Sequence, residues 1–124
     1  MKARVGKVKL RLQKGTFAVI KSKMQYTNAF ANIKDDNETT VIINQTKYNP
    51  SDVISIEKDF KIITFDDVLP FSLVGFLAKV SKSLAEESIP ILAISSFSTD
   101  HILVKKKYFK KAIKKLGEIR FPAK

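Results

Sequence analysis

Two stretches in the second half of the chain have the apolar spacing of amphipathic helices, and they constrain the fold more than any other feature. In residues 72–87 the apolar side chains recur three, four and seven positions apart, which places them on one face of a helix. This predicted buried stripe consists of Leu73, Phe76, Leu77, Val80 and Leu84. In residues 107–116 the apolar residues share one face and lysines occupy the opposite face. We therefore predict two helices, each with an apolar side facing the core.

Short runs rich in β-branched and aromatic residues precede, separate and follow these two helices. They predict strands at residues 60–65, 89–97, 101–105 and 118–121. The resulting order over residues 60–121 is strand, helix, strand, strand, helix, strand, which is the βαββαβ order of the ferredoxin-like fold. This α+β fold has an antiparallel sheet with both helices on one face. It serves many functions, so it identifies none by itself.

The first half of the chain shows weaker signals, all of them for strands and turns. Apolar and basic residues alternate in residues 8–12, as a half-buried strand requires. Residues 16–21 and 39–43 are further predicted strands, and the Asp-Asp-Asn cluster at residues 35–37 is a predicted turn between elements. Residues 24–33 fit neither a helix nor a strand clearly.

Cap and turn residues mark the ends of several predicted elements. Asn49 or Ser51 can cap a short helix at residues 53–57. Residues 98–100 form a tight turn between two predicted strands. Gly117 is predicted to end the second helix in the left-handed conformation, which glycine adopts without steric cost.

The composition is that of an ordinary globular protein, with 44% hydrophobic and 28% charged residues. A length of 124 residues suits one compact domain or two very small units that share a core. No apolar run approaches the roughly 20 residues of a membrane helix. Cysteine is absent, which excludes disulfides and thiolate metal sites. We expect a cytoplasmic protein without membrane association.

The chain is strongly basic, with 23 Lys and Arg against 12 Asp and Glu and a formal net charge of +11. The excess is densest on the polar face of the second helix, at Lys107, Lys110, Lys111, Lys114 and Lys115. Such a face can attract nucleic acid, but any amphipathic surface helix carries polar residues there. We favour a solvated face and keep nucleic-acid binding as the alternative. An RNA-recognition motif needs a Lys/Arg-Gly-aromatic segment on its third strand, and residues 101–105 contain none.

Catalytic signatures are missing from the sequence. The single histidine, His101, lies in a predicted strand, and no serine sits in a Gly-x-Ser-x-Gly segment. The four glycines are too scattered to form a phosphate-binding loop, and no spacing of metal ligands is visible. We therefore predict a protein that is not an enzyme and that uses no cofactor and no metal.

Three segments of the second half carry a resemblance to a known family. They are Phe-Ser-Leu-Val-Gly-Phe-Leu-Ala at residues 71–78, Leu-Ala at residues 84–85, and Ile-Ser-Ser-Phe-Ser-Thr-Asp-His-Ile-Leu-Val at residues 94–104. In their order and spacing these segments resemble the CASTOR-type ACT domain family. The chain departs from residues common in that family at Pro70, Val74, Ser98 and His101.

The resemblance implies an architecture and a function. It implies two ACT-like units in tandem, each with an antiparallel sheet: a degenerate first unit at residues 1–59 and a second unit at residues 60–124. It also implies a non-enzymatic regulatory protein that binds an amino acid or a similar small ligand between ACT units. We expect a homodimer, because an exposed sheet edge invites pairing.

The ligand-binding residues that the resemblance implies are Phe71, Ser72, Leu73, Val74, Gly75, Ser95, Ser96, Thr99 and Asp100. The N–H groups of residues 72–75, as a first helical turn, would attract a carboxylate, and Gly75 would let the ligand approach closely. Asp100 would pair with an amino group, and the nearby hydroxyls would orient the ligand. Each residue also fits a structural role as a cap or a turn residue. An interaction module that keeps the fold without a ligand therefore stays open.

Overall fold

The structure is a computed structural model that describes residues 3–5, 8–66 and 75–119 of the chain. The contacts within the chain divide it into two compact units. Unit 1 consists of Met1–Gln13 and Lys61–Lys124, and unit 2 consists of Lys14–Phe60. Unit 2 is therefore inserted between two parts of unit 1.

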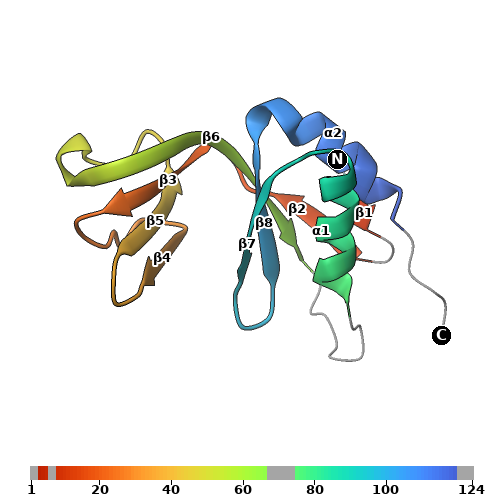
Figure 1. Cartoon of the computed structure of the whole chain (residues 1–124), viewed down its shortest axis with the longest axis horizontal. Coiled ribbons are helices and arrows are strands. Elements are labelled where there is room, and N and C mark those ends of the chain that lie inside the picture. The colour runs from red at the N-terminus through yellow and green to blue at the C-terminus, as the bar shows by residue number, and fades with distance from the viewer. Residues whose placement is uncertain (1–2, 6–7, 67–74, 120–124) are drawn as a thin grey trace. The chain divides into compact units, whose positions relative to one another are not determined.

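Unit 1 contains a sheet in the strand order β1, β2, β6, β8, β7 (Figure 1). The bounds of these strands are β1 Ala3–Val5, β2 Val8–Leu12, β6 Val53–Phe65, β7 Ile91–Ser95 and β8 Asp100–Lys105. β2 runs antiparallel to β6, with Leu10 opposite Phe65. β7 runs antiparallel to β8, with Leu92 opposite Leu103. The first 13 residues thus complete the sheet of the second half, so the compact units differ from a division between residues 59 and 60.

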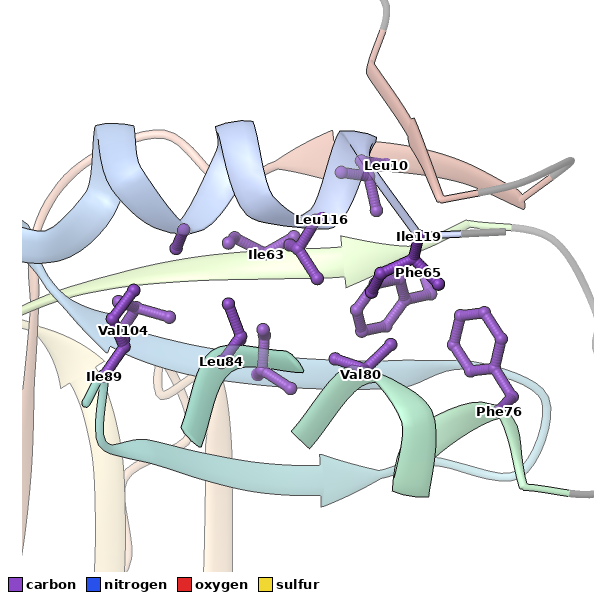
Figure 2. Packing of buried hydrophobic residues seen from close by; sticks show 12 residues of the cluster. Leu10, Ile63, Phe65, Phe76, Val80, Leu84, Ile89, Val104, Leu116 and Ile119 are labelled. Atoms are coloured by element: carbon purple, nitrogen blue, oxygen red, sulfur yellow. The ribbon is translucent and has the colours of Figure 1, made fainter. Parts of the chain in front are cut away.

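Both helices of unit 1 pack on the same face of this sheet. α1 spans Phe76–Glu86, and α2 spans Phe109–Gly117 after a 3₁₀ turn, η2, at Lys106–Tyr108. Buried side chains of the helices meet alternate residues of the strands, as Figure 2 shows. This core contains Leu10, Ile63, Phe65, Phe76, Val80, Leu84, Ile89, Ile102, Val104, Ala112, Leu116 and Ile119. The predicted α+β fold with an antiparallel sheet is confirmed.

The predicted helix at residues 53–57 is wrong, although the predicted cap beside it exists. Asn49 caps a single 3₁₀ turn, η1, at Pro50–Asp52, where its Oδ1 accepts a hydrogen bond from the N–H of Ser51 at 3.0 Å. From Val53 the chain is extended, because β-branched residues follow and the segment pairs with its neighbour strand β3 (Phe17–Ser22). Strand pairing across the sheet overrides the local cap signal here.

Unit 2 is built from strands. β3 lies between the first part of β6 and β5 (Thr39–Asn44), and β5 pairs in turn with β4 (Ala31–Lys34). Ala18, Ile20, Val41 and Ile43 form its buried cluster. The strands predicted at residues 16–21 and 39–43 are confirmed, and the ambiguous residues 24–33 form a loop followed by the first three residues of β4. Residues 14–60, all of which the structure describes, contain no α-helix.

The first helix begins later than predicted. Residues 72–74 lie outside the described residues, and α1 begins at Phe76 with Gly75 as its N-cap. Gly75 has φ 81°, in the left-handed region that glycine adopts most easily. Gly75 therefore precedes the first helical turn.

The end of unit 1 differs from prediction at two points. Gly117 is the last residue of α2, and it is not among the residues with positive φ, so the predicted left-handed stop is wrong. Glu118 forms a turn, and Ile119 packs into the core instead of starting a strand. A further strand beside β6 has no place there, because β2 and β8 already occupy its two edges. Residues 120–121 of the predicted strand lie outside the described residues.

Alanine substitutions at the two glycines should change stability in opposite directions. Gly75→Ala should lower the free energy of unfolding by about 1 kcal/mol, because an alanine at φ 81° is strained. Gly117→Ala should raise it by about 0.5–1 kcal/mol, since a Cβ there meets no atom within 4 Å and alanine favours the helix. Urea unfolding of both variants measures the two changes. Equal signs would contradict the backbone conformations described here.

Candidate functional site

The structure brings the described members of the predicted site to one end of unit 1. Gly75 precedes α1, and the four remaining residues lie in the hairpin of β7 and β8. The start of α1 and the turn of this hairpin are both at the lower end of unit 1 in Figure 1, and both lie toward the right in Figure 2. Phe71, Ser72, Leu73 and Val74 lie outside the described residues.

Hydrogen bonds within the hairpin fix its polar side chains. The Ser95 hydroxyl donates to Asp100 Oδ1 at 2.5 Å. The N–H of Ser96 and its hydroxyl both donate to the carbonyl of Thr99, at 2.8 and 3.0 Å. The hydroxyl oxygens of Ser96 and Thr99 lie 2.9 Å apart. The turn is thus preorganised, with Ser95 and Ser96 exposed and Thr99 and Asp100 half-buried.

The reason for glycine at position 75 is its backbone conformation. A Cβ built on Gly75 would have no neighbour within 4 Å among the described residues. Close packing against those residues therefore does not require glycine, whereas the left-handed φ does. Gly75 brings no side chain to cap α1, and the first turn of that helix contains no acidic residue. An anion at this end of α1 would therefore meet the positive end of the helix dipole without a competing carboxylate in that turn.

Sequence reasoning missed a row of polar side chains on the sheet face opposite the helices. Gln13 Nε2 donates to the Thr64 hydroxyl at 2.9 Å, and that hydroxyl lies 2.9 Å from His101 Nδ1. His101 Nε2 lies 3.4 Å from the Ser96 hydroxyl. The row crosses from the end of β2 over β6 and β8 to the end of β7, and it reaches the hairpin turn. We call Gln13, Thr64, His101 and Ser96 the polar row.

The hydrogen bonds of the polar row suit a neutral imidazole. If the Thr64 hydroxyl accepts from Gln13 and donates to Nδ1, then His101 carries its proton on Nε2 and donates to Ser96. Ser96 can accept that bond because its own hydroxyl proton goes to the carbonyl of Thr99. A second proton on His101 would make Nδ1 a donor. The fully buried Thr64 hydroxyl would then lose Nδ1 as the acceptor of its own proton.

Burial lowers the pKa of His101. Desolvation of the charged imidazolium is the largest cause, the carboxylate of Asp100 opposes it by raising the pKa, and the positive charge of Arg11 adds a smaller lowering. Arg11 itself pairs with Asp66, with Nε 3.0 Å from Oδ1.

The sequence contained one signal that could have revealed the polar row. Thr64 is a polar residue near the end of the mostly apolar run at residues 60–65, and His101 lies in a strand that pairs with that run.

In residues 3–5, 8–66 and 75–119, no group of three or more His, Cys, Asp or Glu side chains gathers where it could hold a metal ion. Within the same ranges, no helix has the length and the apolar content needed to cross a membrane.

The predicted basic face lies on α2 and on the 3₁₀ turn before it. Lys107, Lys110, Lys111 and Lys114 are exposed and Lys115 is half-buried. The Lys111 ammonium lies 3.4 Å from the carbonyl of Glu87, and the Lys107 ammonium lies 5.1 Å from the centre of the Tyr108 ring. These lysines are on the helix layer, whereas the polar row lies on the opposite face of the sheet.

Comparison with protein families gives a match over the second half of the chain. A family model described as "ACT domain" matches residues 55–118, which is 64 of the 124 residues. The matched range holds most of β6 together with α1, β7, β8 and α2, and therefore the whole hairpin and Gly75. None of the curated proteins compared matches the chain.

Solved structures with the same fold include two small bacterial proteins and a regulatory subunit. A protein from Agrobacterium tumefaciens has a TM-score of 0.73 at 18% identity, over 88% of this chain and 86% of that chain. A protein of unknown function from Vibrio cholerae has a TM-score of 0.72 at 22% identity, over 89% and 88%. The regulatory subunit of aspartate kinase from Thermus thermophilus has a TM-score of 0.62 at 9% identity, over 91% and 97%. At these identities the likeness is one of fold.

The stability of the protein should depend on pH through His101. Above pH about 6.5, the usual pKa of histidine, the imidazole is neutral in the folded and in the unfolded chain. As the pH falls below that value the unfolded chain takes up a proton first, because burial lowers the pKa in the folded chain. The free energy of unfolding should therefore fall until the pH passes the lowered pKa.

Urea unfolding between pH 7.5 and pH 5.5 measures this dependence, and His101→Gln is the matched variant. Glutamine keeps hydrogen-bonding groups and does not titrate, so its free energy of unfolding should change less over this range. Parallel curves for the two proteins would show that His101 does not carry the dependence.

Proposed function

Because the chain belongs to the ACT domain family, we propose that it is a non-enzymatic regulatory module that binds an amino acid or a similar small ligand. ACT domains are regulatory domains, and one solved structure with this fold is the regulatory subunit of an aspartate kinase. The observation that carries the proposal is the arrangement at one end of unit 1. Gly75 at the start of α1 and the polar hairpin of β7 and β8 lie at that same end, inside the matched range.

The two parts of this site suit the two charged groups of an amino acid. The start of α1 presents backbone N–H groups and the positive end of the helix dipole, which favour a carboxylate. Asp100 presents a carboxylate that Ser95 holds in place, and such a group pairs with an ammonium. The hydroxyls of Ser96 and Thr99 lie between β7 and β8 and supply neutral hydrogen-bonding groups. The proposed site also includes four residues on the basis of the family resemblance alone: Phe71, Ser72, Leu73 and Val74.

Finer parts of the proposal rest on the family resemblance. They are the CASTOR-type subfamily, a degenerate ACT-like unit in the first half of the chain, a ligand held between ACT units, a homodimer, and a cytoplasmic location. An exposed edge strand supports the dimer, since β7 pairs with β8 and with no other strand of the described residues.

Binding should appear as thermal stabilisation by one or a few amino acids. A ligand present at about 100 times its dissociation constant stabilises a fold by roughly 2.7 kcal/mol, which is an easily measured shift of the melting temperature. Melting curves with each of the twenty amino acids identify such a ligand. Asp100→Asn should abolish the shift, because asparagine keeps the shape of the side chain and loses the charge that pairs with an ammonium.

Ser98→Ala is the matched control for this experiment, since Ser98 is exposed in the same turn and is outside the proposed site. It should leave the shift unchanged. If Asp100→Asn retains the full shift, the site is misplaced. If none of the amino acids shifts the wild-type curve, the alternative of an interaction module that has lost its ligand replaces this proposal.

A further inference from the structure

The charge of the chain is divided unequally between its two units. Unit 1 contains 17 Lys and Arg against 6 Asp and Glu, and unit 2 contains six of each. The whole net charge of +11 therefore belongs to unit 1, and unit 2 is neutral. A general excess of lysine throughout the chain would have charged both units. This asymmetry points to a surface on unit 1 that has its own electrostatic role.

The densest part of that charge is an exposed face of α2 and the turn before it. Seven lysines lie between residues 105 and 115, and no Asp or Glu occurs between residues 105 and 117. We call Lys107, Lys110, Lys111, Lys114 and Lys115 the lysine face. The ion pair of Arg11 with Asp66 and that of Lys21 with Glu38 do not involve this face. The lysine face therefore keeps its charge available to a partner.

The apolar side of α2 is not free to insert into a lipid bilayer. A helix that binds a membrane surface inserts its apolar face between the lipids. In α2 that face is already used, because Ala112 and Leu116 are fully buried in the core of unit 1. Tyr108, Phe109 and Ile113 pack against the same core. Because α2 has no free apolar face, its exposed lysines suit a dense row of anionic charges better than insertion into a lipid bilayer.

We propose that the lysine face of α2 is a docking surface for the phosphate backbone of nucleic acid. A duplex carries one negative charge for every 1.7 Å or so of its length, which is the density that a cluster of lysines can neutralise. Lysine is a compact charge that suits contacts with phosphates, and phosphate contacts carry no direct information about the base sequence. Binding is therefore independent of sequence. This function is separate from ligand binding at the hairpin and does not rest on it.

Salt dependence of binding to a labelled duplex tests this proposal. A fluorescein-labelled 20-base-pair duplex of arbitrary sequence is titrated with the whole protein, and anisotropy is measured between 50 and 200 mM KCl. Contacts with about four phosphates predict that affinity falls about a hundredfold over this range. Replacing Lys110, Lys111, Lys114 and Lys115 by Gln should weaken binding at least about a hundredfold at 50 mM KCl and flatten the salt dependence.

A matched variant separates the lysine face from the net charge of the protein. Replacing Lys14, Lys23, Lys34 and Lys47 by Gln removes the same number of charges from exposed positions of unit 2. This variant should bind within about threefold of the wild type, since its lysines contact no phosphate. Equal losses in both variants would overturn the proposal, because the attraction would then come from net charge alone.

Further measurements keep the test decisive. Replacing the same four lysines of α2 by Arg should preserve binding, and circular dichroism shows that each variant is folded. A titration with phosphatidylserine vesicles distinguishes the two sources of anionic charge. Failure of the wild type to bind the duplex at 50 mM KCl overturns the proposal, as does binding to vesicles without binding to duplex.

The thermal shift caused by an amino acid should be the same in the α2 Gln variant as in the wild type, because the ligand site at the hairpin is separate from the lysine face.

Discussion

Strand β6 serves both units, and most of the fold depends on how its 13 residues are shared. Its first part pairs with β3, with Ser55 opposite Lys21 and Phe60 opposite Phe17. Its last part pairs with β2 on one side and β8 on the other. Buried backbone groups must find partners, and β6 finds them in strands that are distant in the sequence. The first 13 residues therefore belong to unit 1, although 47 residues of unit 2 separate them from the rest of it.

The register of β6 also decides which side chains can form a site. Ile63 and Phe65 face the helices and join the core, so Thr64 between them must face the opposite side. There the Thr64 hydroxyl contacts His101, and the polar row extends to the hairpin turn. A slip of one residue would place the Thr64 hydroxyl among the apolar side chains of the helix-side core and remove Phe65 from that core. The same alternation thus builds the core and supports the hairpin of the proposed ligand site.

The second half of the chain could be predicted from its sequence because its signals are local. The apolar stripe of α1 and the turn between β7 and β8, which lies at residues 96–99 and was predicted at 98–100, depend on residues within a few positions of one another. One failure depends on a distant partner: residues 53–57 are extended because β3 lies beside them, despite a genuine cap at Asn49. The polar row joins residues that are far apart in the sequence: 51 positions separate Gln13 from Thr64, and 37 separate Thr64 from His101. A single sequence does not reveal such pairs. Of the predicted site, the hairpin residues are placed together, whereas their binding role stays a prediction.

The lysine face is not explained by the stability of α2. Like charges four residues apart, such as Lys110 with Lys114 and Lys111 with Lys115, destabilise a helix by about 0.2–0.5 kcal/mol per pair. Lysines in the last turn interact favourably with the helix dipole by about 0.3–1 kcal/mol each, so Lys114 and Lys115 offset that repulsion. The two effects are of similar size and nearly cancel. A helix that needed only a solvated face would be as stable with mixed charges, because glutamate placed four residues before lysine attracts where lysine repels. A face of lysines alone therefore fits a surface that binds phosphates better than one that only contacts water.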